Sequence, residues 1–456
     1  MKTINVLTRQ SVFLGGLLLL MAEIVLSPFG WGHTAMANDP LKLEVAFDNP
    51  QAEANREGER VLELLVTSIL QPNQISVRSH TPLNIVLIID TSGSMAQERK
   101  LETVKSAAQN ILGYLRPGDS FALVTYDNSA RVCIPSEPVE NLAQAHQMID
   151  ALQPGGSTNL SAGLEEGYRQ LHSHHDPTMI NRVFLLSDGL ANMGEVNPVR
   201  LGESVEREAQ RGISLSTFGV GLEFNETLMA ELSERGRGMY HFIDEPERIK
   251  EVFAHAFKAT QEMVAQDVQL TVSLIPSAKV TEVFANSYQT RDNTIIIQAG
   301  DLSAGELRRI QLRVETAKFG QGLHEIGQVR IRYQQPGTSF PITQSQPLVL
   351  QYGYFGLEID RSRDRGITER TKVFEAHYAR NRAAEVFDRG DTDAAKRILH
   401  ESLEKLRNAK VHGQKISREL NATSTYLQSL EQQLNRHERT KSQKTVKYKK
   451  YLLEGC

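Results

Sequence analysis

The stretch LNIVLIIDTSGSM, residues 83–95, decides the fold class of this chain. An almost wholly apolar run ends at Asp90, four small residues follow, and a segment with helical spacing begins near Glu98. A short, nearly continuous apolar run is typical of a strand that is buried on both faces, as in a parallel sheet. Gly93 permits a tight turn between the strand and the helix. We therefore expect a strand, loop and helix with polar side chains at the carboxyl end of the strand.

The same alternation continues as far as Lys258. Segments with helical spacing separate three further apolar runs: DSFALVTYD (119–127), VFLLSD (183–188) and ISLSTFGVG (213–221). Strands that alternate with helices predict a parallel sheet covered on both faces. The predicted fold class is α/β, a doubly wound, mostly parallel, Rossmann-like sheet over residues 83–260.

The flanking regions have other patterns. Residues 261–355 contain short alternating runs separated by Gly, Pro, Asp and Asn, which predict a small antiparallel β domain of the sandwich type. We expect two strands in residues 38–82 to be part of this β domain, with the α/β unit inserted between them and residues 261–355. Residues 365–440 have helical spacing.

The last predicted helix has the alternating four-three spacing of a coiled-coil seam, through Ile416, Leu420, Thr423, Leu427, Leu430 and Leu434. This seam suggests an oligomer formed through the C-terminal helices. Residues 441–456 form a Lys-rich segment, for which we expect a solvated basic tail. The alternative for the tail is contact with an acidic surface of the cell envelope.

Composition and motifs exclude several classes of protein. The chain has 456 residues, 40% hydrophobic and 23% charged, which is ordinary globular composition. A net charge of −4 gives no strong field for nucleic acid, so no nucleic-acid partner is expected. The sequence contains neither a GxxxxGK[ST] phosphate loop nor a GxSxG nucleophile elbow, and we expect no enzymatic activity.

The N-terminus has the pattern of a signal peptide over residues 1–37. Lys2 and Arg9 precede an apolar run, and Ala35-Met36-Ala37 has the small-x-small form of a cleavage site. The alternative is a membrane anchor, but the apolar run is interrupted by Glu23. We expect export and cleavage after Ala37, which leaves a soluble periplasmic or extracellular protein. Two cysteines, Cys133 and Cys456, do not make a disulfide scaffold, and whether they pair stays open.

Polar side chains at the ends of three strand-helix units form the candidate site: Asp90, Ser92, Ser94, Thr158 and Asp188. Ligands of open α/β sheets bind at the carboxyl ends of the strands, where these loops meet. All five side chains offer oxygen, which suits Mg²⁺ or Mn²⁺ rather than zinc or copper. The alternative for DTSGS on its own is an ordinary serine-capped helix start.

These five residues resemble the metal ion-dependent adhesion site of von Willebrand factor type A (VWA) domains, over residues 83–258. The resemblance implies hydroxyl ligands at Ser92, Ser94 and Thr158 and anionic ligands at Asp90 and Asp188. The string SDGLANMG (187–194) is similar to bacterial secreted members and, more distantly, to the heavy chains of inter-alpha-trypsin inhibitor.

Our leading hypothesis is an exported adhesion or scaffolding protein whose metal captures an acidic residue of a protein partner. The first alternative is a structural assembly component of the cell envelope. It would act through its β and helical domains, and the metal would merely brace the loops. An Mg²⁺-dependent hydrolase ranks last.

The export hypothesis predicts the mass of the mature chain. Trp31, the single tryptophan, lies within the expected signal peptide, so the processed protein should begin at Asn38 and contain no tryptophan. Intact-mass measurement of protein from the exporting cell checks this. A mature chain that retains Trp31 would contradict it.

Overall fold

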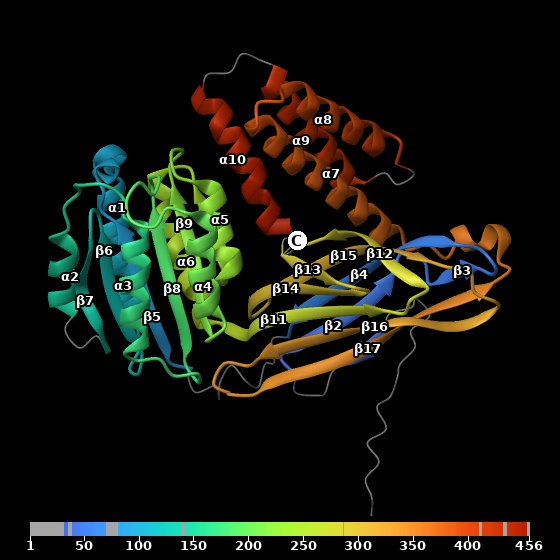
Figure 1. The fold of residues 1–456 in the computed structure, drawn as a ribbon, viewed down its shortest axis with the longest axis horizontal. Helices are drawn as coiled ribbons and strands as arrows, with labels where there is room; N and C mark the ends of the chain where they lie inside the picture. Colours follow the sequence, from blue (N-terminus) through green and yellow to red (C-terminus); the bar gives the residue numbers. More distant parts are fainter. Residues whose placement is uncertain are drawn as a thin grey trace, which may run out of the picture.

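A computed structural model describes residues 32–34, 39–69, 81–138, 142–285, 287–409, 413–431 and 436–453 (Figure 1). The predicted signal region therefore lies outside the described residues, except that β1 (Gly32–Thr34) pairs with β2 (Leu41–Phe47). Leu434 and Cys456 also lie outside them. Of the helices in the described ranges, none is both long and apolar enough to cross a bilayer.

The central domain is a six-stranded sheet with the strand order β10-β9-β8-β5-β6-β7, covered by helices on both sides (Figure 1). Neighbouring strands are parallel except for β6 with β7. Strand β5 is buried along its whole length, as its continuous Ile, Val and Leu residues predict. The α/β fold class is therefore confirmed. The strands are β5 (Leu83–Asp90), β6 (Ser120–Tyr126), β7 (Ala130–Pro138), β8 (Ile180–Ser187), β9 (Ile213–Val220) and β10 (Arg237–Ile243).

The two faces of this sheet have separate helical layers. One face packs against α1 (Lys100–Tyr114), α2 (Leu142–Asp150) and α6 (Ile249–Gln261), and the other against α3 (Leu160–His172), α4 (Pro198–Ala209) and α5 (Glu226–Arg235). The sequence did not indicate the antiparallel strand β7. Its two prolines and mixed polarity are compatible only with the edge position that it occupies.

Strands before and after the α/β domain form one β-sandwich around a shared apolar core. Its two sheets have the strand orders β1-β2-β4-β15-β12 and β13-β14-β11-β16-β17-β3, so the α/β domain is inserted between β4 and β11. The remaining strands are β3 (Gln51–Glu53), β4 (Gly58–Ser68), β11 (Met263–Leu274), β12 (Ala278–Phe284), β13 (Tyr288–Arg291), β14 (Thr294–Ser303), β15 (Leu307–Thr316), β16 (Gly322–Gln334) and β17 (Pro341–Gly353).

The sandwich meets the α/β domain at the amino ends of the parallel strands. Arg182, near the start of β8, forms an ion pair with Asp301 of β14. Arg237, the first residue of β10, lies 2.7 Å from the Asp267 carboxylate of β11. The backbone N–H of Asp267 also donates to Asp301 at 3.0 Å. The sandwich is therefore attached at the edge of the sheet opposite to the carboxyl ends of its strands.

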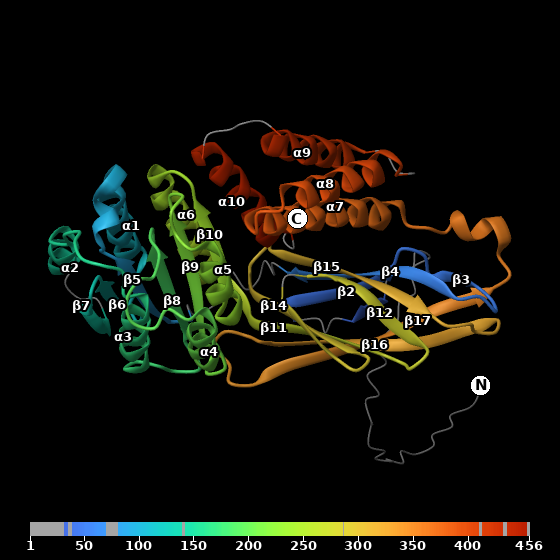
Figure 2. The ribbon, with the colours of Figure 1, turned by 45° about the horizontal axis from the view of Figure 1, so that its top comes forward.

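Helices α7 (Arg365–Asp388), α8 (Thr392–Arg407) and α9 (Gln414–Glu431) lie beside the sandwich (Figure 2). A buried carboxylate, Glu63 of β4, fastens α7 to the sandwich. Arg370 of α7 donates to both oxygens of Glu63, at 2.9 and 2.7 Å, and Gln311 of β15 donates at 2.7 Å. Because the buried charge is fully hydrogen-bonded, it holds α7 in one position on the sheet.

The apolar seam predicted on the last helix of the 365–440 region packs against other helices of the same chain. Ile416, Thr423, Leu427 and Leu430 of α9 are buried, and the apolar members pack in clusters with residues of α7 and α8. The spacing expected for a partner helix is therefore used for packing inside one bundle, because α7 and α8 supply the apolar neighbours.

The expectation of a solvated basic tail over residues 441–456 is wrong for its described part. Helix α10 (Arg436–Leu453) runs between the α/β domain and helices α7 and α9 (Figures 1 and 2). Its Tyr448 ring meets Tyr240 and Phe242 edge-on, with centroids 5.8 and 6.3 Å apart. The helix is thus an interdomain element with an aromatic contact at its centre.

The lysines of α10 find acidic partners on other elements. Lys441 lies 3.2 Å from Asp244, and Lys447 lies 3.7 Å from Glu226 and also pairs with Asp388. Burial raises the pKa of Glu226 to about 7, with the nearby lysines opposing the shift. The sequence did not reveal these pairs, because no acidic residue lies among the lysines themselves and the partners come from distant segments.

Tyr448→Ala should loosen α10 without unfolding the domains. An aromatic pair contributes about 0.5–1.5 kcal/mol beyond its buried area, so the amides of α10 should exchange about 2- to 10-fold faster. Hydrogen exchange measures this, with Lys449→Ala, at an exposed position of the same helix, as the control. Equal rates in the two variants would mean that the ring does not hold the helix.

Candidate metal centre

Asp90, the last residue of β5, is completely buried at the carboxyl edge of the sheet. Its Oδ1 accepts a hydrogen bond from the backbone N–H of Ser92 at 2.8 Å. Its Oδ2 accepts hydrogen bonds from the hydroxyls of Ser187 at 2.8 Å and Tyr126 at 3.4 Å. Because Tyr126 ends β6 and Ser187 ends β8, three adjacent strands fix the position of this carboxylate.

Ser92 occupies the N-cap position of the short helix η2 (Gly93–Arg99), yet its hydroxyl makes no capping hydrogen bond. Instead, Ser92 Oγ lies 3.2 Å from Ser94 Oγ, and the Ser94 hydroxyl donates to Asp188 Oδ1 at 2.7 Å. A serine that merely starts a helix would accept a hydrogen bond from a backbone N–H of the first turn. The geometry therefore favours a polar cluster over an ordinary helix cap.

Thr158 and Asp188 reach this cluster from two further loops. Asp188 directly follows β8, and Thr158 precedes α3; both are buried. A Cβ atom at Gly189 would lie 3.5 Å from both Ser94 Oγ and Thr158 Oγ1, so the missing side chain keeps open a small space between these hydroxyls. The N–H of Thr158 donates to the Asn192 side chain at 2.9 Å, which ties the two loops together. The structure thus gathers all five predicted residues.

Lys100 is a further member of the cluster that the sequence analysis missed. Its Nζ lies 2.9 Å from Asp188 Oδ2, and the two side chains are 7% and 0% exposed. A signal was present: Lys100 shares the buried face of α1 with Val104 and Ile111. A lysine on such a face needs a buried partner, but the spacing of residues along the helix does not say which one.

The electrostatics of the cluster favour an added cation. Burial raises the pKa of Asp90 to about 6, although hydrogen bonds from Ser92 and Ser187 oppose the shift, and nearby Asp188 raises it further. The cluster has two carboxylates, those of Asp90 and Asp188, and one ammonium, that of Lys100, which pairs with Asp188. The cluster therefore keeps negative charge when both carboxylates are ionised.

The donor set fits a hard divalent cation. Hydroxyl and carboxylate oxygens are the ligands that Mg²⁺ and Mn²⁺ prefer. In the described part of the chain, no three His, Cys, Asp or Glu side chains gather into a group able to hold a metal. A metal at this edge of the sheet would therefore need the neutral hydroxyls of Ser92, Ser94 and Thr158 in addition to the carboxylates.

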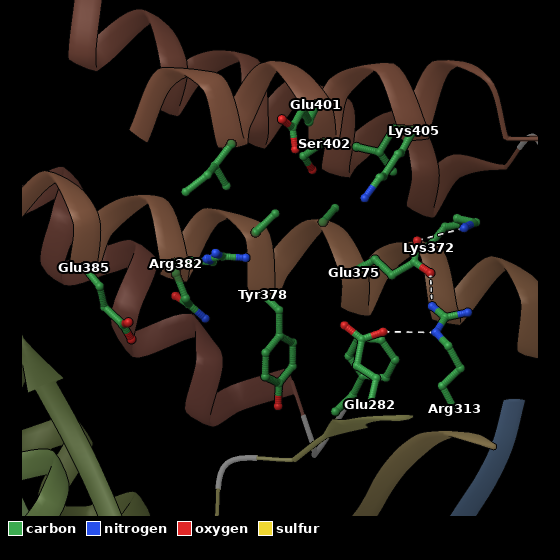
Figure 3. A pocket seen from close by; sticks show the side chains of 16 residues that line it. Glu282, Arg313, Lys372, Glu375, Tyr378, Arg382, Glu385, Glu401, Ser402 and Lys405 are labelled. Atoms are coloured by element: carbon green, nitrogen blue, oxygen red, sulfur yellow. Dashed lines mark hydrogen bonds and ion pairs between the residues drawn. The ribbon is translucent and has the colours of Figure 1, made fainter. Parts of the chain in front are cut away.

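A separate cavity of about 620 Å³ lies between the sandwich and helices α7 and α8 (Figure 3). Arg313 of β15 donates to Glu282 of β12 at 3.0 Å and forms a second ion pair with Glu375 of α7. Lys372 donates to the other oxygen of Glu375 at 2.8 Å. These pairs fasten α7 to the sandwich, and we assign them a structural role.

Comparisons with known proteins agree with the fold of the central domain. A family model described as von Willebrand factor type A domain matches residues 84–255. The protein YfbK of Escherichia coli (strain K12) is 34% identical over 245 residues, which cover 52% of this chain and 42% of YfbK. Inter-alpha-trypsin inhibitor heavy chain H2 of Sus scrofa is 28% identical over 239 residues, covering 50% of this chain and 25% of the heavy chain. The chain thus spans less than half of each of these relatives.

The similarity to solved structures extends beyond the central domain. The von Willebrand factor type A protein from Catenulispora acidiphila superposes with a TM-score of 0.68 at 17% identity, and the match covers 93% of this chain and 99% of that protein. The sandwich and the helices therefore share that architecture too. From the family match and the sheet topology together, residues 84–255 of this chain form a von Willebrand factor type A domain.

Proposed function

We propose that this protein is an exported binding protein that holds Mg²⁺ or Mn²⁺ and uses the ion to capture an acidic side chain of a protein partner. A VWA domain points to protein binding or adhesion. The observation that carries the metal-dependent mechanism is the convergence of five oxygen-bearing side chains from three loops at one edge of the sheet.

Each residue has a definite part in this proposal. Ser92, Ser94 and Thr158 hold the ion through neutral hydroxyls, and Asp90 and Asp188 balance its charge. When bound, the ion supplies an electrophilic position that a carboxylate of the partner can fill. We assign binding rather than catalysis, because the sequence contains neither a GxxxxGK[ST] phosphate loop nor a GxSxG nucleophile elbow.

The position of the cluster supports access by a partner. The sandwich is attached at the amino ends of the strands, through Arg182 and Arg237, whereas the cluster lies at their carboxyl ends. Export is supported by the basic, apolar and small-x-small pattern of residues 1–37. Together these features favour a protein that meets its partner outside the cytoplasm.

Asp90→Asn should abolish stabilisation by Mg²⁺. A ligand that binds only the folded state stabilises it by about 2.7 kcal/mol at a hundred times its Kd, so melting of the wild-type protein should rise with Mg²⁺ and fall back with EDTA. Asp127→Asn, which neutralises a carboxylate in the loop after β6, is the matched control and should keep the shift. Ser94→Ala provides a second test that leaves the buried charge in place. A full Mg²⁺ shift in both site variants would reject the metal centre.

Lys100→Met should strengthen Mg²⁺ binding. The Lys100 ammonium neutralises Asp188 and repels an added cation, so its removal should tighten the Kd by at least about tenfold, as the Coulomb energy of a buried pair suggests. Calorimetric titration measures the Kd. Lys105→Met is the control, because Lys105 is also buried on α1 but pairs with Glu102. Weaker binding in Lys100→Met would show that this lysine positions Asp188 for the ion instead of opposing the ion.

A further inference from the structure

We propose that residues 189–199, which comprise the loop after β8 and the first two residues of α4, are a docking surface for apolar side chains that flank the carboxylate of the partner. This inference rests on the proposed function and adds the chemistry of the partner. Of the eleven large apolar side chains that are exposed in the described ranges, four lie in this one segment, three in the loop and one at the start of α4. The four, here called the apolar patch, are Leu190 (57% exposed), Met193 (39%), Val196 (47%) and Val199 (53%).

The apolar patch adjoins the metal centre. The loop starts directly after Asp188, and its backbone is hydrogen-bonded to the Thr158 loop. The N–H groups of Asn192 and Met193 donate to the carbonyl of Thr158 at 3.1 and 3.3 Å. A ligand held at the cluster would therefore lie beside the first residues of this segment.

The loop is held in one conformation by polar contacts of its own. Gly194 has a φ of +71°, and a Cβ atom there would lie 2.3 Å from Asn159 Oδ1, so only glycine fits. The N–H of Glu195 donates to Ser161 Oγ at 3.0 Å, and Asn197 caps α4 by accepting from Val199 N–H at 3.0 Å.

This arrangement is what a binding surface requires. The backbone is fixed by hydrogen bonds, yet the four apolar side chains are 39–57% exposed, so the protein itself leaves much of their apolar area uncovered. Exposed apolar groups that cluster in this way mark interaction sites. A loop that is already ordered loses little conformational entropy when a partner binds.

The chemistry of the two neighbouring surfaces specifies the partner. The metal centre takes one carboxylate, and the apolar patch takes aliphatic or aromatic side chains. The acidic residue within the loop, Glu195, pairs with Arg200 at 3.2 Å and leaves no strong charge beside the patch. The expected partner is a protein segment with Asp or Glu close to apolar residues. A polyanionic glycan or nucleic acid lacks the apolar groups.

Selection of short randomised displayed peptides on the immobilised full chain, loaded with Mg²⁺ and eluted with EDTA, tests this. The wild-type protein should enrich Asp or Glu together with a nearby apolar residue. The double variant Leu190→Ser/Val199→Ser should still enrich the acid but lose the apolar preference, and should bind a wild-type-selected peptide about tenfold more weakly. Leu323→Ser, at an apolar position of β16 that is 75% exposed, is the control and should behave like the wild type. Calorimetry should give equal Mg²⁺ affinity for all three proteins.

The outcomes separate this inference from the proposed function. Acidic enrichment without apolar preference in the wild-type protein would overturn the docking surface and leave metal-dependent capture intact. Absence of acidic peptides released by EDTA would overturn the proposed function and this inference with it. If the double variant instead lowers the molar mass of the protein in sedimentation, the patch pairs two copies of the chain, and the inference is wrong.

Discussion

The buried carboxylate of Asp90 is the constraint on which the functional edge of the molecule depends. A buried charge without partners would be costly, so the surrounding strands must supply hydrogen-bond donors. The Tyr126 and Ser187 hydroxyls do so from the ends of β6 and β8, and the N–H of Ser92 does so from the following turn. These bonds align the ends of three strands and thereby the loops that follow them. Burial raises the pKa of Asp90 by more than the hydrogen bonds lower it. The ionised carboxylate is therefore incompletely stabilised by the protein, and a nearby cation would stabilise it further.

Two lysines on different elements lie at the loop between β9 and α5. The Lys100 ammonium lies near Gly221, the first residue of this loop, because a Cβ atom at Gly221 would be 3.4 Å from it. Lys444 of α10 donates to the carbonyl of Phe224 at 3.0 Å and lies 3.8 Å from the centre of its ring. The C-terminal helix is therefore connected to the ion pair of Lys100 and Asp188 through a few residues of one loop. This connection gives the last helix a structural link to the candidate metal centre.

The VWA domain is thus held at two edges. The sandwich is attached at the amino ends of β8 and β10, and α10 reaches the carboxyl end of β10 through Asp244. The loops after β5 and β8 belong to neither attachment. In this arrangement the scaffold is rigid where the domains join, whereas the residues that could hold a metal and a partner stay on the remaining edge.

The sequence by itself determined the α/β class and the set of candidate ligands. Both depend on local pattern: a strand such as LNIVLIID must be buried on both faces, and loops at the carboxyl ends of parallel strands must meet. Only the tertiary structure decided which charged groups pair. Lys100 finds Asp188 88 residues away, and Lys444 finds Phe224 220 residues away, so neither contact has a local signature. The packing of the α9 seam against α7 and α8 also has no local signature, and neither has the exposure of Leu190 and Val199. The identity of the distant segment that covers a given side chain, or leaves it uncovered, is not contained in the pattern of residues along the chain.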